Sequence, residues 1–549
     1  MFSMQSNRWN WTWAGVALGC LVLVITAAGC RTAAPTSEPQ ATGSAPIAPS
    51  ASTQAPIEQA QEPSPQATEV SLQPLALPAP GDPALGLLPA ARQDVGSLEN
   101  PTRYLLALDI DPSLRSFQGR GRVEYTNQED IPLDEVYFRL LPNGQKSYGN
   151  GSLSVREVQV DGSLASTELS QQDTVLKVDL PDSLAPGEGV EIELAFAGEV
   201  PLDFGGEAEP AGYGIYNLSQ DVLALSGWYP ILAVYDEQGW NLDPVSEIGD
   251  SVYSDTGLYS VNVCAPANLV VAATGSSIDD QASGDKTCIQ FESGPTRDFF
   301  LIASPNFQQE SQQVDGVSVN SYSLPGHEQA SQAALMIAAD SLRVFNQKFG
   351  AYPFAELDMV DAPMRNALGV EYPGVILIGN SLYEKPLEPE FAVTIAHEVA
   401  HQWWYSVVGN DVFASPWLDE GLTTYSSSLY YEFDQSPEFT SGLIAYWQQR
   451  YERLKTEGKD DQITASLEHF ESLNNPSVYG TVVYTKAALF FRALRQEIGD
   501  EAFFDALQRY YEAKKYRIAA PTDLLDAFEE AAGKPLDAFY DTWLFTPKP

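Results

Sequence analysis

The sequence predicts a multidomain α+β protein in which an all-β domain precedes a mostly helical domain that carries a small sheet. From about residue 99 to 325, apolar and polar residues alternate with period two, and Gly, Pro and Asp interrupt the runs. From about residue 326 to 549, apolar residues recur instead at helical spacing. A chain of 549 residues is also longer than one hydrophobic core usually serves. We therefore expect a β domain at 99–325 and a helical domain at 326–549.

The first 29 residues have the features of an export signal. Arg8 precedes an apolar run at 13–25, and small residues lead to Cys30. The pattern resembles a bacterial lipoprotein signal, which implies cleavage before Cys30 and acylation of its thiol, although Ala27 stands where such signals more often have Leu. A plain signal peptide and an uncleaved anchor helix are the alternatives, but the run is shorter than the roughly 20 residues of a membrane span. We predict a lipid-anchored protein of the cell envelope, periplasmic or at the cell surface.

Residues 30–98 are rich in Pro, Ala, Ser, Thr and Gln and nearly free of aromatic residues. Such a segment cannot bury enough apolar surface to offset the entropy of ordering it. We predict a disordered tether between the anchor and the folded domains. No later segment of the sequence is long and apolar enough to cross a bilayer.

The charge of the chain excludes one class of partner. Lys and Arg number 30 against 74 Asp and Glu, a formal net charge of −44. A surface this acidic repels phosphate groups, so we expect no nucleic-acid partner and no binding to an anionic membrane surface through the protein itself. We expect a soluble monomer beyond its anchor.

The predicted elements follow in order along the chain. Strand-like runs of the β domain include 104–109, 121–125, 190–196 and 269–273. Helical spacing covers 330–349, 386–407, 421–433, 438–454, 485–498 and 501–514. A strand-rich island around 357–360 and 375–379 interrupts the helices and predicts the small sheet.

Two cysteines remain for the folded part, because Cys20 lies in the signal and Cys30 at its end. Cys264 and Cys288 both lie in or beside strand-like runs, and an exported protein meets oxidising conditions. We predict a disulfide between them, with two buried thiols as the alternative.

The segment 397–401 reads His-Glu-Val-Ala-His, and Glu420 follows after eighteen residues. Residues four apart lie on one face of a helix, so His397 and His401 can bind one metal ion. A catalytic zinc site needs three imidazole or carboxylate ligands and a free position, and Glu420 completes the set. Glu398 lies off the ligand axis, where it can act as a general base toward water. We predict one Zn²⁺ per chain.

A solvent-exposed helix face could also carry two histidines at this spacing. The chain has only four histidines, however, and the residues on both sides of the motif, 391–396 and 402–405, are mostly apolar. These flanks predict a buried helix, which favours the metal site.

The zinc motif, Gly-Val-Glu-Tyr-Pro-Gly at 369–374 and Tyr-Thr-Lys at 484–486 together resemble the M1 family of zinc metallopeptidases, the gluzincin aminopeptidases. The resemblance covers about residue 100 to the end. It implies a saddle-like β domain and a thermolysin-like catalytic domain. It also implies a short form of the family, without the large C-terminal helical-repeat domain of many members.

The resemblance implies two substrate-binding residues on an edge strand. In the family, a Gly-X-Met-Glu-Asn segment lies beside the zinc, and its glutamate binds the free α-amino group of the substrate. By position this glutamate is Glu371, and Gly369 takes the variable place. Leu368, Val370 and Tyr372 depart from the family pattern, which puts the local backbone geometry and the first side-chain pocket in question. An exposed strand glutamate before a Pro-Gly turn is the alternative.

Tyr484 stands where the family has a tyrosine whose hydroxyl stabilises the oxyanion. Tyr479 is a weaker candidate for the same region, with packing as an equal alternative. The segment 227–230, which in the family should approach the site, does not identify a second amine-binding residue.

These residues together predict a zinc aminopeptidase that takes peptides with a free N-terminus. One rival keeps the metal but cleaves internal bonds, since the anchor strand is altered. The other, from a different class, is an envelope peptide-binding protein on a peptidase fold.

Overall fold

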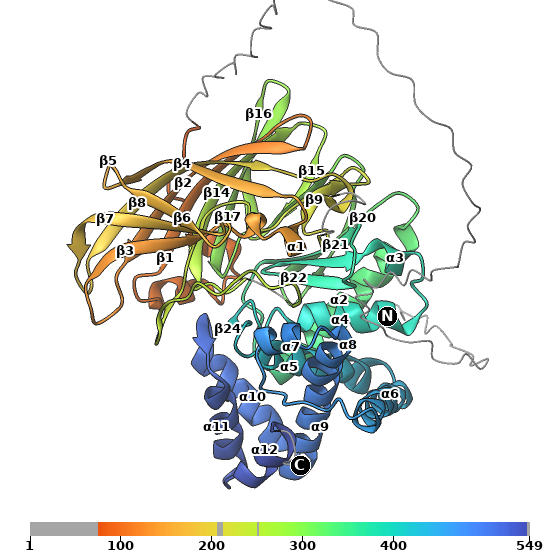
Figure 1. The fold of residues 1–549 in the computed structure, drawn as a ribbon. Helices are drawn as coiled ribbons and strands as arrows, with labels where there is room; N and C mark the ends of the chain where they lie inside the picture. The colour runs from red at the N-terminus through yellow and green to blue at the C-terminus, as the bar shows by residue number, and fades with distance from the viewer. Residues whose placement is uncertain (1–74, 206–211, 250–251, 546–549) are drawn as a thin grey trace, which may run out of the picture. The chain divides into compact units, whose positions relative to one another are not determined.

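The structure is a computed structural model that describes residues 75–205, 212–249 and 252–545. These residues all belong to one compact unit. The predicted signal, Cys30 and the tether up to residue 74 lie outside the described residues. Figure 1 shows the strand-rich first half in red to green and the helix-rich second half in cyan to blue. The predicted α+β order, strands first and helices after, is confirmed.

An eight-stranded sheet dominates the β domain, in the order β16-β17-β14-β1-β2-β8-β4-β5. Its strands β2 and β8 alternate buried and less buried residues along their whole length, because successive side chains point to opposite faces. The inner face packs an aromatic core in which Tyr104 stacks on Tyr259 at 4.6 Å and Trp228 contacts Tyr229 edge-on at 5.0 Å. The strands are β1 Thr102–Ile110, β2 Ser116–Thr126, β4 Ser152–Val160, β5 Ser163–Leu164, β8 Gly189–Glu199, β14 Gly257–Pro266, β16 Ser276–Ser283 and β17 Lys286–Thr296.

Two four-stranded sheets and a short hairpin complete the strands of this half. One sheet has the order β15-β18-β10-β9 and the other β11-β3-β7-β6, while β12 pairs with β13. Their bounds are β3 Leu133–Arg139, β6 Thr167–Ser170, β7 Val175–Leu184, β9 Tyr216–Ser219, β10 Val222–Leu225, β11 Ile231–Leu232, β12 Tyr235–Asp236, β13 Gly239–Trp240, β15 Val270–Ala273 and β18 Leu301–Ser304. One short helix, α1 Gln145–Tyr148, and the 3-10 turns η3 Leu141–Asn143 and η4 Asp203–Gly205 lie among them.

The predicted disulfide is present. Cys264 on β14 and Cys288 on β17 lie directly opposite each other in the antiparallel register, and their sulfur atoms are bonded. The bond joins neighbouring strands of the large sheet.

The predicted tether is too long at its C-terminal end. Residues 75–98 are ordered, with 3-10 turns η1 Pro83–Gly86 and η2 Arg92–Ser97. Leu87 is buried, and its neighbour Leu88 donates its N–H to Pro353 O at 2.8 Å. The composition of this segment did not predict these contacts. A few apolar side chains are enough to order a segment that packs against surfaces formed by the rest of the fold.

The sheet of the helical half is larger than predicted and begins earlier. It has the order β19-β20-β21-β23-β22, and β20 runs parallel to β21. The strands β19 Gln308–Val314 and β20 Val317–Ser323 therefore pair with β21 Glu356–Ala362, although the sequence placed them in a β domain ending at residue 325. The hairpin of β22 Gly369–Tyr372 and β23 Val375–Gly379 completes the sheet, with β22 at the edge.

All six predicted helical segments contain helices. The α-helices of this half are α2 Glu328–Lys348, α3 Asn380–Tyr383, α4 Pro389–Ala400, α5 Trp417–Tyr430, α6 Pro437–Thr456, α7 Leu467–Ser472, α8 Pro476–Tyr479, α9 Ala487–Ile498, α10 Asp500–Lys514, α11 Pro521–Ala532 and α12 Asp537–Trp543. Two π-helical turns, η5 Tyr431–Gln435 and η6 Gly480–Lys486, follow α5 and precede α9. Within the described residues, no helix combines the length and the apolar character that a membrane crossing requires.

The segment 386–407 does not form one long helix, as its spacing predicted. Helix α4 starts with Pro389, which suits the first turn of a helix, and ends at Ala400 with His401 as its cap. Tyr405 then has φ +142°, outside the helical range, and the chain enters β24 Val408–Asn410, which pairs in parallel with β25 Arg517–Ala519. The apolar run beyond the helix reflects a buried turn, because Trp403 and Trp404 both lie in the core.

Candidate active site

Four elements of the helical half bring the predicted site residues together. Helix α4 carries His397 and Glu398 and is capped by His401, α5 carries Glu420, the edge strand β22 carries Glu371, and the π-turn η6 carries Tyr484. Helix α4 packs against both α5 and β22. Gly421 allows the close approach of α5 to η6 and α9, because a Cβ there would lie 2.4 Å from the Ala487 Cβ.

The three predicted metal ligands converge on one point. His397 Nε2 lies 3.2 Å from both His401 Nε2 and Glu420 Oε2, and His401 Nε2 lies 3.4 Å from the same carboxylate oxygen. Two imidazoles and one carboxylate at these distances form the donor set that a catalytic zinc ion requires. The His397 side chain keeps 16% of its surface exposed, so solvent reaches this side of the centre.

The orientation of His401 suits a metal ligand. Its Nδ1 lies 3.0 Å from Trp404 O and 3.3 Å from Thr423 Oγ1. A carbonyl oxygen can only accept, so Nδ1 carries a hydrogen. The lone pair of Nε2 would face the centre once Nε2 gives up its own proton, as a metal ligand does. Sequence reasoning did not find Thr423 or the Trp404 carbonyl, because neither belongs to a motif.

The electrostatics of the centre also favour a cation. Burial alone would lower the pKa of His401, but Glu371 and Glu420 outweigh it and hold that pKa well above its usual value. Burial would raise the pKa of Glu420, yet hydrogen bonds from His397 and His401 bring it well below its usual range. Three buried carboxyl groups surround two imidazoles, and a divalent ion at the centre would favour the ionised form of each carboxyl group.

Glu398 lies beside the ligands and groups with His401 and Glu371, not with His397 and Glu420. It is buried, and its Oε2 has no hydrogen-bond partner within the described residues. Burial, with Glu371 next in effect, raises its pKa well above the usual carboxyl value. Gly369 lies against it, since a Cβ at position 369 would be 2.2 Å from Glu398 Oε1. A raised pKa makes the ionised form of Glu398 a stronger base, as proton abstraction from water requires.

Glu371 reaches the same centre from the edge strand. Its Oε1 lies 3.7 Å from His401 Nε2, and its carboxylate lies close to the Glu398 carboxylate and the His401 imidazole. Burial raises its pKa to about 7, opposed by His401. Tyr372, which replaces the family asparagine, stacks on Phe300 with ring centroids 3.8 Å apart. The strand is therefore ordered at Tyr372, and Glu371 is buried, contrary to the alternative of an exposed strand glutamate.

Tyr484 contacts the ligand set directly. Its hydroxyl donates to Glu420 Oε1 at 2.5 Å, and its ring stacks on His397 at 6.0 Å. Burial, and next the charge of Glu420, raise its pKa well above the usual phenol value, so the hydroxyl keeps its proton. It lies on a π-helical turn, a feature often found at functional sites. Tyr479 packs edge-on against Tyr484 at 5.7 Å and is buried.

The segment 227–230 does not contribute side chains to this centre. Trp228 and Tyr229 are fully buried in the aromatic core of the β domain, where Trp228 Nε1 donates to Phe299 O at 3.1 Å. The structure thus gives these residues a packing role.

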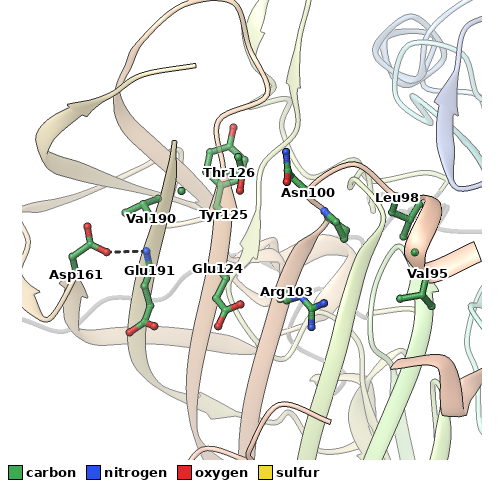
Figure 2. A pocket seen from close by; sticks show the side chains of 13 residues that line it. Val95, Leu98, Asn100, Arg103, Glu124, Tyr125, Thr126, Asp161, Val190 and Glu191 are labelled. Carbon is green, nitrogen blue, oxygen red and sulfur yellow. Dashed lines mark hydrogen bonds between the residues drawn. The ribbon is translucent and has the colours of Figure 1, made fainter. Parts of the chain in front are cut away.

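A separate hollow of about 630 Å³ lies on the β domain and shares no residue with the centre. Figure 2 shows Arg103, Glu124 and Glu191 side by side on its strands, with Asp161 accepting a hydrogen bond from the Glu191 N–H at 3.0 Å. Its lining mixes both charges and contains neither histidine nor cysteine. It offers no donor set comparable to that of His397, His401 and Glu420.

The comparisons agree with this geometry. Residues 333–543 match the family described as the Peptidase family M1 domain. The chain is 23% identical over 469 residues to Aminopeptidase M1 of Arabidopsis thaliana, covering 81% of this chain and 50% of the relative. It is 27% identical over 305 residues to Aminopeptidase M1-B of Oryza sativa subsp. japonica, covering 52% and 34%. The chain thus spans half or less of the length of these curated relatives.

Solved structures share the fold. An M1 zinc metallopeptidase from Deinococcus radiodurans superposes with a TM-score of 0.59 at 22% identity, covering 82% of this chain and 94% of that one. A mutant of it bound to a Tyr-Ser-Ala substrate gives 0.59 at 21%, covering 82% and 95%. The chain therefore has the fold of these M1 zinc metallopeptidase structures, a β domain followed by a helical domain. Within that fold, residues 333–543 of the chain match the domain of peptidase family M1.

Proposed function

We propose that this protein is a zinc-dependent aminopeptidase that removes N-terminal residues from peptides. The observation that carries the proposal is the convergence of His397, His401 and Glu420 on one point, with Glu398 and Glu371 on its border. His397, His401 and Glu420 would hold the ion. When bound, zinc would lower the pKa of water and polarise the scissile carbonyl.

The residues of the chain divide the remaining work. Glu371 receives the substrate ammonium group, a charge-assisted contact that places the first peptide bond at the centre. Glu398 takes a proton from the attacking water while the water oxygen bonds to the carbonyl carbon. Glu398 then gives this proton to the leaving amine as the C–N bond breaks. The Tyr484 hydroxyl donates to the oxygen that gains negative charge. The products are a free amino acid and a shortened peptide.

Hydrolysis of aminoacyl-arylamides and their N-acetylated counterparts, with and without a chelator, tests the proposal. Chelator-sensitive cleavage of the free-amine substrates alone, lost in Glu371→Gln, is the expected result. Glu384→Gln provides the matched control, because Glu384 is exposed just beyond the same hairpin. Equal cleavage of blocked substrates would favour an endopeptidase, and zinc binding without turnover would favour a peptide-binding protein.

We also propose that the protein is held at the extracytoplasmic side of a membrane through lipid on Cys30, on the sequence pattern of residues 1–30 alone. Incorporation of a labelled fatty acid into the full chain, abolished in Cys30→Ala, tests this proposal. Release of unlabelled protein into the soluble fraction by wild type would contradict it.

A further inference from the structure

Gln402 links the metal-binding helix to the strand that carries Glu371. The residue follows His401 directly and is fully buried. Its Nε2 donates to Tyr372 O at 3.0 Å, and its Oε1 accepts from the Gly374 N–H at 2.9 Å. One side-chain amide thus uses both of its ends on the two sides of the β22–β23 turn.

The hairpin depends on such a contact because of its place in the sheet. Strand β22 has only four residues and pairs only with β23 along its described length. An edge strand this short is weakly held by its own ladder. Tyr372 follows Glu371 directly, so the Tyr372 carbonyl bound by Gln402 lies next to the residue proposed to bind the amine. The stacking of Tyr372 on Phe300 also holds the strand but does not connect it to helix α4.

The chemistry of an aminopeptidase makes this connection important. In an N-terminal residue, the amine nitrogen and the scissile carbonyl carbon are separated by a single Cα. The distance between the Glu371 carboxylate and the metal ligands must therefore match that short spacing, since misplacement by about 1 Å can cost a hundredfold in rate. Glu371 lies on the strand, whereas His397 and His401 belong to α4 and its cap.

We propose that Gln402 is a positioning residue that sets the spacing between Glu371 and the metal ligands, and thereby restricts cleavage to the first peptide bond. The inference rests on the proposed aminopeptidase function. It assigns a specificity role to a residue that touches neither the substrate nor the ion.

The test compares α-aminoacyl arylamides with β-aminoacyl arylamides, whose amine lies one methylene farther from the carbonyl. Wild type should prefer the α-aminoacyl substrate strongly. Gln402→Met keeps the volume and removes both hydrogen bonds to the turn, together with a longer one that Ser406 Oγ donates to Gln402 Oε1 at 3.4 Å. We therefore expect kcat/KM for the α-aminoacyl substrate to fall about 10- to 100-fold, with little change for the β-aminoacyl one. Gln402→Glu still accepts from Gly374 N–H but no longer donates to Tyr372 O, and should give a smaller loss of the same preference.

A double-mutant cycle separates positioning from general loosening. In a Glu371→Gln background the strand no longer carries an anchor, so Gln402→Met should cost less than about threefold. Asn127→Leu is a matched control, since Asn127 is equally buried and its amide donates to Ile131 O and Leu184 O in the β domain. It should lower the melting temperature without changing the α-to-β preference.

Several results would overturn the inference. An unchanged α-to-β preference in both Gln402 variants would do so, as would an equal cost of Gln402→Met with and without Glu371. Loss of bound zinc in parallel with activity would mean that Gln402 supports the ligands instead of the spacing. If Gln402→Met does not fold, Gln402→Glu carries the same comparison. Failure of the proposed function is distinct, because wild type itself would then show no dependence on a free amine.

Discussion

The two halves of the candidate active site are built in different ways. His397, Glu398 and His401 belong to one helix and its cap, and Glu420 lies on α5, whose residues are all buried. Glu371 instead lies on a four-residue edge strand. This strand is held by its pairing with β23, by the hydrogen bond from Gln402 and by the stacking of Tyr372 on Phe300. The helical repeat of α4 therefore positions most of the residues of the metal-binding half within a single element. The amine-binding half depends on contacts between elements. We therefore expect substitutions to alter the preference for a free amine more readily than the metal-dependent reaction.

Removal of the proposed general base, Glu398, should cause the largest loss of activity among these substitutions. Glu398→Gln keeps the shape but cannot accept a proton, so kcat should fall by about 10²–10⁴-fold. Zinc content should stay near one per chain, because Glu398 lies outside the ligand set. Glu390→Gln, about two turns earlier on α4, is the control and should retain activity. Retained turnover in Glu398→Gln would remove Glu398 from the mechanism.

The Tyr484 hydroxyl tests whether η6 belongs to the chemistry or only to the support of Glu420. Tyr484→Phe should lower kcat by about 10²–10³-fold with a small change in KM, since the contact to the oxyanion forms only in the transition state. Tyr425→Phe removes another buried hydroxyl, one that accepts from Arg495, and should leave kcat near wild type. A loss of zinc affinity as large as the loss of kcat would assign Tyr484 to ligand support alone.

Gly369 joins the two halves, and a substitution there should have a moderate effect. The Cβ of Gly369→Ala would meet the end of the Glu398 side chain, which can move aside. We expect kcat to fall roughly tenfold through the displaced carboxylate, with the free-amine preference retained. Steady-state kinetics on free and N-acetylated substrates check this. A lost preference with unchanged kcat would show that the strand moved and the base did not.

The smallest effect is expected for Asp358, which lies inside the sheet that carries Glu371 at its edge. Here the predicted change is in stability and not in activity. Asp358 on β21 is buried, and its partner is Asn320 at 2.7 Å. Burial, and next the charge of Glu356, raise its pKa well above the usual value. A raised carboxyl pKa means that the fold prefers the protonated form, so this contribution to stability is present at acidic pH and is lost as pH rises through the folded-state pKa.

Asp358→Asn should therefore stabilise the protein at pH 8 by about 1–3 kcal/mol, the usual cost of a buried group without full compensation. The gain should shrink as pH falls toward the unfolded carboxyl value. Chemical denaturation at several pH values measures it, with the exposed Asp280→Asn as control. An equal gain at all pH values would show that charge is not the cause.

Much of the fold followed from local patterns. The change from period two to helical spacing predicted the order of strands and helices, and the paired strand-like runs predicted the Cys264–Cys288 disulfide. Boundaries were less predictable. The strands β19 and β20 lie within the segment assigned to the β domain, yet β20 pairs in parallel with β21, a long-range pairing that no local pattern encodes. Residues 75–98 have the composition of a tether, but they are ordered because Leu87 is buried against the fold and Leu88 N–H donates to Pro353 O.

The sequence by itself determined the metal-binding chemistry. Two histidines four residues apart, a glutamate between them and a second glutamate after a gap of eighteen residues are enough, because the helix repeat places the two histidines on one face. Only the tertiary structure decided that the Trp404 carbonyl and Thr423 orient His401, that Gly369 borders Glu398, and that Gln402 joins the metal helix to the strand of Glu371. These contacts join elements brought together by packing, and their residues carry no spacing that a single helix or strand would impose.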